Sequence, residues 1–364
     1  MSTADSAAAI SARELAGLFV SFPPSGRVIL AVSGGADSTA LMVLAQRWRR
    51  RRARGPELVA ATVDHGLRPG SQAEAKAVGV LARRLGLKHE TLMWRGTKPK
   101  TGVEAAARVA RYRLLAELAR RLGAEAIATD HTLDDQAETV LMRLAAGSGP
   151  GGLAGMRTRD TRDGIVLLRP LLGVRKARLV ATLARADIAW VDDPMNADPA
   201  FARPRLRAAG IVLAREGLTA ERVARLAERM ARYEEAVTAA VEAARAHIAD
   251  PHRPGRLDAR ALLAAPQEVA LRLLAAAIVD AGTSCAAEKP LRLQRLEALW
   301  DDLHAAITAG RPIKRTLAEA LVTIDRDGTV LITAAPRRRT VFRRTGGVPR
   351  SRRNAAKHPF TKPR

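Results

Sequence analysis

The 364-residue sequence contains one cysteine, Cys285, and only 3% aromatic residues. A single thiol cannot form an internal disulfide, a CxxC metal site or a pair of catalytic thiols, so these classes of protein are excluded. No apolar run approaches the roughly 20 residues that a membrane span needs, and no basic-then-apolar signal opens the chain. These absences predict a cytoplasmic protein with no membrane part, in which Cys285 is a small buried residue.

Acidic residues are also scarce, because 37 Asp and Glu face 61 Lys and Arg, a net charge of +24. Such an excess favours a polyanionic partner, through contacts to phosphates and the release of counterions. The segment 336–364 carries eleven Lys and Arg and no acid. Its low apolar content predicts a disordered basic tail.

What the chain does have is an alternation of short apolar runs with helical patterns. Apolar, β-rich runs predict strands at 27–33, 58–64, 88–94 and 124–129, and helical spacing predicts helices at 38–54, 72–85, 103–122 and 134–145. Strands that alternate with helices indicate a parallel sheet covered on both faces. The predicted fold class is therefore α/β, with a doubly wound parallel sheet.

Beyond this domain the pattern becomes mainly helical. We expect a glycine-rich loop at 147–155, an edge strand at 166–172, helices at 175–186 and 219–248, and a strand pair at 321–324 and 330–333. The predicted organisation is a helical lead-in at 1–24, an α/β domain at 25–205, a mainly helical domain at 206–335 and the tail at 336–364.

The hexapeptide SGGADS follows the first predicted strand and opens a helix. Glycines let the backbone approach phosphates closely, while hydroxyls and helix N–H groups bind them, and a carboxylate can hold Mg²⁺. The alternative is a glycine turn capped by Ser38. The segment is neither a Walker A loop nor a dinucleotide fingerprint. The predicted ATP ligands are Ser33, Gly34, Gly35, Ala36, Asp37 and Ser38, with Asp37 as the candidate Mg²⁺ ligand.

This segment resembles the SGGxDS signature of PP-loop ATP-pyrophosphatases. The resemblance implies an adenine nucleotide α-hydrolase-like fold and an enzyme that splits ATP between the α and β phosphates to adenylate a substrate oxygen. Thiolating members of the superfamily use cysteine pairs or clusters, and amidotransferase members need a glutaminase domain. A chain with one cysteine favours a free amine as the acceptor.

Four further motifs resemble the tRNA(Ile)-lysidine synthase family over roughly residues 25–207. They are VDHGLR at 63–68, EAAAR with RY at 104–112, HTLDDQAET at 131–139 and RPLLGVRK at 169–176. The resemblance implies a ligase that forms a carbon–nitrogen bond. It would adenylate C2 of the wobble cytidine (C34) in tRNA(Ile) with a CAU anticodon, and free L-lysine would then displace AMP to give lysidine. The helical domain would bind tRNA.

The resemblance also assigns site residues. Asp134, Asp135 and Glu138 begin a helix and could hold the lysine ammonium or a metal ion and take a proton from the amine; an acid-rich first turn that favours the helix dipole is the alternative. The predicted catalytic residues are Asp37, Asp135, Glu138 and Arg108. The predicted substrate-binding residues are Asp134, Asp135, Glu138, Arg111, Arg203 and Arg207.

Two histidines, His65 and His131, end predicted strands at the same edge, and we predict that they contact the nucleotide; hydrogen-bonded structural histidines are the alternative. For Arg108 and Arg111 the alternative is a solvated helix face. The segment FARPRLR at 201–207 departs from the family pattern, because Pro204 replaces an expected asparagine.

Two rival functions stay open from the sequence. One is another PP-loop tRNA-modifying enzyme such as a 2-thiocytidine synthetase, which the single cysteine disfavours. The other is an RNA-binding relative with an inactive ATP site, which the intact loop disfavours. A homodimer through the helical region is a further expectation.

Overall fold

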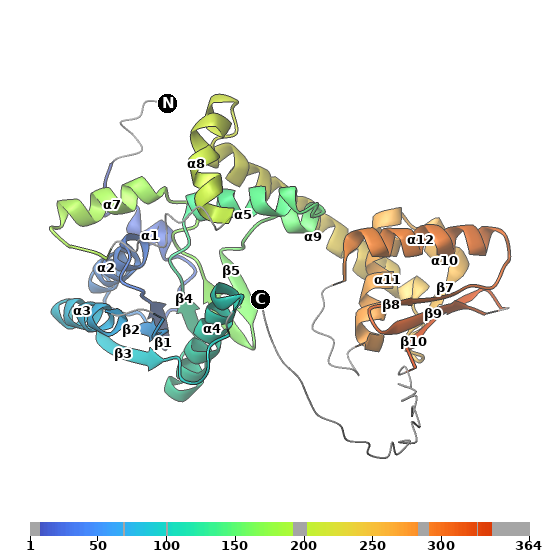
Figure 1. The fold of residues 1–364 in the computed structure, drawn as a ribbon, viewed down its shortest axis with the longest axis horizontal. Coiled ribbons are helices and arrows are strands. Elements are labelled where there is room, and N and C mark those ends of the chain that lie inside the picture. Colours follow the sequence, from blue (N-terminus) through green and yellow to red (C-terminus); the bar gives the residue numbers. More distant parts are fainter. Residues whose placement is uncertain are drawn as a thin grey trace, which may run out of the picture. The chain divides into compact units, whose positions relative to one another are not determined.

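The computed structural model describes residues 8–67, 70–99, 101–191, 202–282, 291–325 and 327–336. The chain divides into two compact units, Met1–Ala240 and Val241–Arg364 (Figure 1). Cys285 and the tail after Pro336 lie outside the described residues, so the expectations for them stay predictions.

A six-stranded sheet forms the centre of unit 1, in the order β3-β2-β1-β4-β6-β5. Neighbouring strands pair in parallel except β5, which pairs antiparallel with β6. The strands are β1 (Arg27–Ala31), β2 (Glu57–Asp64), β3 (Lys88–Met93), β4 (Ala126–Ala128), β5 (Arg159–Arg162) and β6 (Ile165–Leu168). The strand order reverses between β1 and β4, which confirms the predicted doubly wound sheet and marks the point where such sheets bind ligands.

Helices cover both faces of this sheet (Figure 1). On one face lie α1 (Leu15–Leu18), α2 (Ala36–Arg50), α3 (Ser71–Arg84) and α7 (Lys176–Arg185), and on the other lies α4 (Val103–Leu122). Helices α5 (Leu133–Ala145) and α6 (Pro150–Leu153) follow β4 and pack against each other. On β1, Val28 and Leu30 pack in a core with α2, α3 and α7, whereas Ile29 and Ala31 pack against α4. Because both faces of β1 are buried, the strand is a continuous apolar run.

The outer edge of the sheet differs from the prediction. Residues 166–172 were expected to form an edge strand, but Ile165–Leu168 lies inside the sheet and β5 takes the edge. The side chains of β5 are all exposed, so no apolar pattern marks this strand. It forms through a hairpin at Asp163 and Gly164, both with positive φ. The glycine-rich loop contains the short helix α6, and the predicted lead-in contains the four-residue helix α1.

Two further helices, α8 (Ala202–Arg215) and α9 (Ala220–Ile248), follow α7 in the described chain. The unit boundary falls within α9, whereas the sequence placed a domain boundary at 205/206. The physical reason is packing on α5, where Ala137 and Val140 share a core with Val223 and Ala227 of α9. This contact keeps α8 and most of α9 with the catalytic unit.

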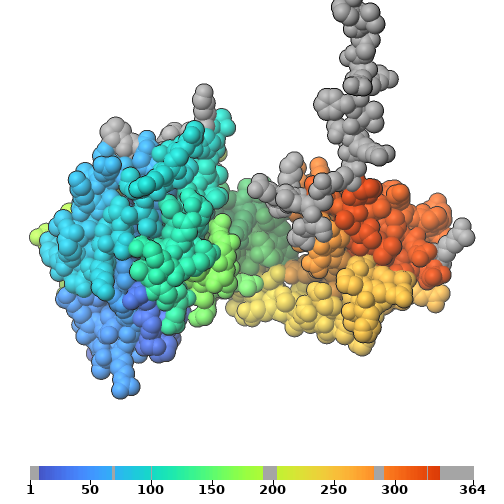
Figure 2. Space-filling model, turned by 90° about the horizontal axis from the view of Figure 1, so that it is seen from below, coloured from blue at the N-terminus to red at the C-terminus, as the bar shows by residue number. Residues whose placement is uncertain are grey.

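Unit 2 combines helices with a four-stranded antiparallel sheet in the order β7-β10-β9-β8. Its elements are β7 (Arg256–Asp258), α10 (Ala259–Ala264), α11 (Gln267–Gly282), α12 (Leu293–Thr308), β8 (Lys314–Leu317), β9 (Ala320–Ile324) and β10 (Thr329–Ala334). In Figure 2 the surface of unit 1 runs from blue through green to yellow, and that of unit 2 from yellow-orange to red. The predicted strand pair is confirmed in β9 and β10; β7 and β8 were not predicted.

Candidate active site

Three polar segments of unit 1 lie at one edge of the sheet, where the sequence placed His65 and His131. The segment Ser33–Ser38 follows β1, Asp64 and His65 end β2, and residues 129–135 follow β4. These three strands are neighbours in the order β2-β1-β4, and parallel strands bring their carboxyl ends to the same edge.

Ser38 holds the SGGADS loop in shape. Its hydroxyl oxygen accepts the backbone N–H groups of Ser33 and Gly34, both at 3.1 Å, and donates to the carbonyl of Gly35 at 3.0 Å. The residue is fully buried. The serine predicted as an ATP ligand thus also shapes the turn, which is the role that the cap alternative assigns to it.

The two loop glycines are required for different reasons. Gly34 has φ +97°, a conformation that strains other residues, and an added Cβ would meet Val78 at 3.2 Å. Gly35 begins α2 with an ordinary φ of −67°, and its nearest neighbours to an added Cβ are 3.9 Å away. The protein itself therefore leaves room for a side chain at Gly35, which is the room that a phosphate would need.

This difference makes a testable prediction. Gly35→Ala should fold with a Tm within about 3 °C of the parent but bind ATP at least about 10-fold more weakly, because a methyl group occupies the phosphate space. Gly34→Ala should instead destabilise the protein by about 1–2 kcal/mol through its left-handed φ. Thermal unfolding and ATP titration of both variants measure the two effects. Equal loss of stability in both variants would contradict the distinction.

Asp37, in the first turn of α2, is a largely buried carboxylate beside this loop, with its side chain 18% exposed. Burial raises its pKa to about 6, although the nearby ammonium of Lys176 acts against this shift. One oxygen, Oδ2, lies 3.2 Å from Lys176 Nζ. The other, Oδ1, is buried without a hydrogen-bond partner among the described residues. A buried carboxylate oxygen without a hydrogen-bond partner is suited to bind a cation.

The described residues contain no group of three or more His, Cys, Asp or Glu side chains placed to hold a metal ion. Mg²⁺ in nucleotide sites keeps several waters and binds one or two carboxylates together with the phosphates. The lone carboxylate of Asp37 fits this mode, and it would place a bound Mg²⁺ against the phosphates to neutralise their charge.

A cavity of about 180 Å³ opens at the ends of β1 and β2. Its walls include Val32, Ala61, Val63 and Leu115, with Arg111 among the polar groups. It adjoins the loop, because Ser33 also lines it. Its other polar lining residues are Thr62, Asp64, His65, Ser71 and Glu74. The cavity therefore combines apolar walls with polar groups, as a site for the flat, hydrogen-bonding ring of a nucleobase requires.

His65 lies in this cavity, as predicted for a nucleotide contact. Burial is the main cause that lowers its pKa, and Arg111 adds to the effect. Its ring packs edge-on against Trp94 with centroids 5.8 Å apart. His65 Nδ1 and Asp64 Oδ2 are buried with no hydrogen-bond partner among the described residues, and the remaining Asp64 oxygen accepts the N–H of Gly66 at 2.8 Å. Both orphaned atoms are available to a ligand.

His131 is tied down by its neighbour, because its Nδ1 shares a hydrogen bond of 2.9 Å with the hydroxyl of Thr129. Burial lowers its pKa to about 4, so the ring is neutral at pH 7. A neutral buried imidazole can orient a nucleotide but is a poor proton donor. At least one ring nitrogen of His131 is therefore used in a hydrogen bond within the protein, as the structural alternative predicts.

The shifted pKa of His131 predicts a pH dependence of stability. Its pKa of about 4 in the folded protein lies below the ordinary value of 6.5. At pH values between 4 and 6.5 the unfolded chain therefore binds more protons at this residue than the folded protein does. Stability is lost as the pH falls from about 6.5 towards 4, by about 2 kcal/mol between pH 7 and pH 5. Urea unfolding at both pH values should show that His131→Gln removes most of this loss. An unchanged pH dependence in the variant would refute the assignment.

The acidic start of α5 is held by a capping box. Asp135 Oδ2 accepts the backbone N–H of Thr132 at 2.9 Å and its hydroxyl at 2.8 Å. Asp134 points instead to α7, where one oxygen accepts the N–H of Lys176 at 2.7 Å and the other lies 3.3 Å from Arg175. Both carboxylate oxygens of Asp134 are thus committed to joining α5 and α7.

Glu138 lies one turn further along α5, and its side chain is 9% exposed. Arg207 of α8 donates from Nε to Oε1 at 2.6 Å and from a terminal nitrogen to Oε2 at 3.3 Å. The same guanidinium lies 3.9 Å from Asp135 Oδ1, and Arg203 lies 4.0 Å from Glu138. Burial raises the pKa of Glu138, against the effect of Arg207. Four predicted substrate-binding residues therefore meet at one buried cation site.

Pro204 lies between these two arginines, in the first turn of α8. The first backbone N–H groups of a helix have no partner within it, so a proline there costs no hydrogen bond. The exchange of the expected asparagine for Pro204 is therefore compatible with the position of Arg203 and Arg207.

Arg108 and Arg111 project from α4 towards different partners. Arg108 stacks over the ring of Tyr112 at 5.2 Å, and Arg162 of β5 lies 4.5 Å from the same ring. Arg111 lies 3.7 Å from Asp130, next to β4, and lines the cavity that holds His65. Partial burial lowers the pKa of Arg108, with neighbouring arginines adding to the shift. Arg111 is therefore tied to the site, whereas Arg108 is exposed to solvent, so the alternative of a solvated helix face stays open for Arg108.

The basic run at the end of α2 lies at the opposite edge of the sheet. Arg49 donates to the carbonyl of Pro56, just before β2, and Arg50 to that of Leu85, just before β3. These arginines therefore stabilise the strand-starting edge, away from the SGGADS loop.

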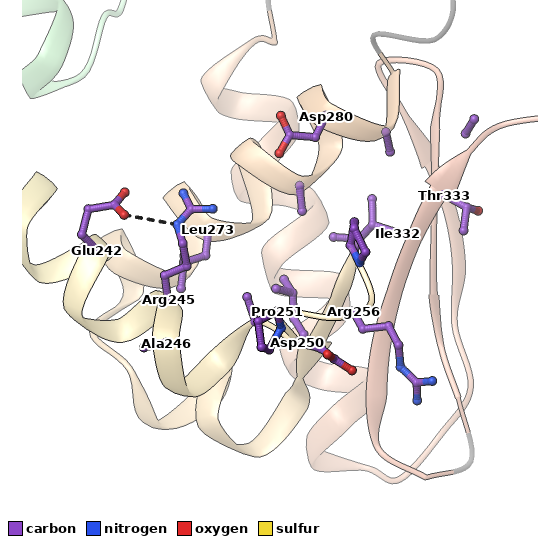
Figure 3. A pocket seen from close by; sticks show the side chains of 17 residues that line it. Glu242, Arg245, Ala246, Asp250, Pro251, Arg256, Leu273, Asp280, Ile332 and Thr333 are labelled. Atoms are coloured by element: carbon purple, nitrogen blue, oxygen red, sulfur yellow. Dashed lines mark ion pairs between the residues drawn. The ribbon is translucent and has the colours of Figure 1, made fainter.

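A separate cavity of about 790 Å³ lies in unit 2, between the end of α9, α11 and β10 (Figure 3). Its walls carry an ion pair between Glu242 and Arg245 with atoms 3.5 Å apart. It contains none of the residues predicted from the sequence to form the site, so its size does not make it the catalytic centre.

Sequence reasoning did not assign a site role to Lys176 or Arg175. The signal for both was present, because they belong to the RPLLGVRK motif that was matched as a whole. Their contacts come from other elements, which a single motif does not reveal.

The doubly wound sheet and the phosphate-binding loop at its switch point define a PP-loop enzyme that uses ATP. A family model described as "PP-loop domain" matches residues 7–212. A solved structure, the U34-tRNA thiolase NcsA of Methanococcus maripaludis, shares this fold with a TM-score of 0.51 and 16% identity, covering 60% of this chain and 78% of that one.

Three curated relatives identify a particular family within this class of ATP-using enzymes. A "tRNA(Ile)-lysidine synthase" of Bradyrhizobium sp. is 50% identical, covering 91% of this chain and 96% of the relative. Relatives of that name from Rhodopseudomonas palustris (49%; 91% and 97% covered) and Methylobacterium sp. (53%; 87% and 91% covered) agree. The chain belongs to the tRNA(Ile)-lysidine synthase family, so it is a tRNA-modifying ligase that uses ATP. Within the described part of the chain, no helix is long and apolar enough to cross a membrane.

Proposed function

We propose that this enzyme ligates lysine to C2 of the wobble cytidine, C34, in tRNA(Ile) with a CAU anticodon. One observation carries the proposal: the ATP loop and the buried cation site of Asp135 and Glu138 follow neighbouring strands, β1 and β4, at one sheet edge. An adenylating site beside a cation site suits the joining of an amine to an activated oxygen. Identity of 50% to a relative bearing the family name supports the same function.

In the first step ATP activates the cytidine. The adenine ring occupies the cavity of His65, and the phosphates lie on residues 33–38, with Asp37 holding Mg²⁺. The cytidine oxygen O2 attacks the α-phosphorus, the bond from this phosphorus to the bridging oxygen breaks, and pyrophosphate leaves. Positioning and neutralisation of phosphate charge account for most catalysis of this kind. Arg108 and Arg111 are the cations available to the nucleotide and the cytidine ring.

In the second step lysine replaces AMP. The guanidinium of Arg207 lies between Asp135 and Glu138, which supports the proposal that these two carboxylates can receive a cation. We propose that the lysine ammonium takes this position and Arg207 moves aside. One of the two carboxylates takes a proton from the ammonium, the free amine attacks C2, the C2–O2 bond breaks, and AMP leaves with that oxygen. Burial raises the pKa of Glu138, which favours this carboxylate as a proton acceptor.

Asp134 takes a positioning role in this scheme, because its oxygens bind α7. Unit 2 binds tRNA in this proposal. Its positive charge comes from the segment 337–364, which carries eleven Lys and Arg and no acid, because residues 241–336 carry twelve Lys and Arg against twelve Asp and Glu. We propose the cytoplasm as the place of action, where tRNA, ATP and free lysine occur together. A homodimer completes the proposal, supported by apolar side chains exposed on and after α8: Ile211, Val212 and Leu218.

The test mixes the enzyme with ATP, radiolabelled lysine and a tRNA(Ile) transcript that carries CAU. Label should enter the RNA only when ATP and C34 are both present, and a transcript with uridine at position 34 is the matched control. ATP consumption that needs a sulfur donor, with no lysine in the RNA, would favour a thiolating enzyme and reject the proposal.

A further inference from the structure

Lys176 is the first residue of α7, and its backbone is fixed to the catalytic helix α5. Its N–H donates to Asp134 at 2.7 Å, and the carbonyl of Val174 accepts the N–H of Leu133 at 2.9 Å. Arg175 adds an ion pair to Asp134 at 3.3 Å. The start of α7 therefore cannot shift without disturbing α5.

The side chain of Lys176 crosses from α7 to the ATP loop. Its ammonium lies 3.2 Å from Asp37 Oδ2, and the two side chains are 47% and 18% exposed. Helices α2 and α7 pack together on the same face of the sheet, in the core that contains Leu41 and Leu179. The ammonium thus lies beside the N-terminus of α2, where backbone N–H groups face the phosphate site.

This ion pair is easily exchanged. Half-exposed lysine pairs contribute little to stability, and lysine holds a phosphate as a mobile point charge. Asp37 is the residue that would hold Mg²⁺, and a second positive charge at this carboxylate would repel the ammonium of Lys176. The nearest anionic oxygens would then be those of the β- and γ-phosphates.

We propose that Lys176 is a catalytic residue of adenylation: its ammonium leaves Asp37 and binds the pyrophosphate part of ATP. When the bond between the α-phosphorus and the bridging oxygen breaks, the electron pair of that bond goes to the β-phosphate. The ammonium then stabilises the negative charge of the departing pyrophosphate. This inference rests on the ATP-dependent first step proposed above, and adds a leaving-group residue that the loop does not contain.

The experiment measures binding of pyrophosphate and of AMP separately, by titration calorimetry with Mg²⁺ and without tRNA or lysine. Lys176→Ala should weaken pyrophosphate binding about 10- to 100-fold, the worth of one charge-assisted hydrogen bond, and change AMP binding by less than about twofold. Lys176→Arg, which keeps the charge, should stay within about fivefold of the parent for pyrophosphate.

Lys88→Ala is the matched control. It removes the same charge from β3, where Lys88 pairs with Glu57 at the strand-starting edge, and it should leave both affinities unchanged. If Lys176→Ala fails to fold, Lys176→Met keeps the apolar stem of the side chain, and the affinities for pyrophosphate and AMP are measured on that variant instead.

Unchanged pyrophosphate binding in Lys176→Ala would overturn the proposal. Equal losses for pyrophosphate and AMP would also overturn it, because they would mean that Lys176 only holds the loop in shape. Neither measurement involves lysidine, so the proposal can hold if the assigned tRNA reaction fails, and can fail if that reaction is found.

Discussion

Asp37→Ala is expected to lower the rate of AMP and pyrophosphate release by at least about 10³-fold while tRNA affinity stays within about twofold. The expected loss is large because Asp37 is the largely buried carboxylate of the ATP loop, with one oxygen free for a cation. The tRNA contacts lie elsewhere, so binding should survive. Pyrophosphate release and filter binding of labelled tRNA measure the two quantities.

Two control variants sharpen this test. Asp37→Asn keeps the shape but not the charge and should lose nearly as much activity as Asp37→Ala. Glu117→Ala removes an acid of equal charge from an exposed pair with Arg113 and should leave the rate unchanged. Full activity in Asp37→Asn would show that the negative charge is dispensable and that Asp37 holds no Mg²⁺.

Glu138→Gln is expected to separate the two steps. Lysine transfer should fall by at least about 100-fold, because the cation site loses its buried charge and its favoured proton acceptor. Adenylation should change by less than about fivefold, because Glu138 contacts α8 and not the ATP loop. Without lysine, the variant should still release pyrophosphate and accumulate adenylated tRNA, which gel analysis of labelled ATP detects.

The matched comparison is Arg207→Gln, which removes the cation that now fills the site. It should tighten lysine binding or leave it unchanged if lysine and Arg207 compete for Asp135 and Glu138. If Glu138→Gln slows adenylation as much as lysine transfer, Glu138 serves the ATP step, and the division of roles proposed for the acids is wrong.

Much of the catalytic fold could be predicted because its signals are local. The helix predicted at 103–122 is α4 residue for residue, since helical spacing between two glycine ends marks it. Strand β5 could not be predicted, because its exposed polar side chains carry no periodic pattern and pairing with β6 alone makes it a strand. The same holds for β8, whose side chains are mostly exposed.

Part of the candidate site could likewise be predicted from the sequence, and part of it could not. The ATP loop is contiguous in sequence, so its residues and their glycine requirement could be inferred from one hexapeptide. The division of labour between Asp134 and Asp135 could not, because it depends on where α7 lies against α5. The contact of Arg207 with Glu138 likewise depends on α8 packing on α5, over 69 residues of sequence.

The most direct test of the central claim is mass spectrometry of nucleosides from tRNA(Ile) after reaction with the enzyme, ATP and lysine. The account predicts that the cytidine at position 34 becomes heavier by one lysine less one water, and that Asp37→Ala and Glu138→Gln both abolish this product. An unmodified cytidine, or a sulfur-containing nucleoside at that position, would contradict it.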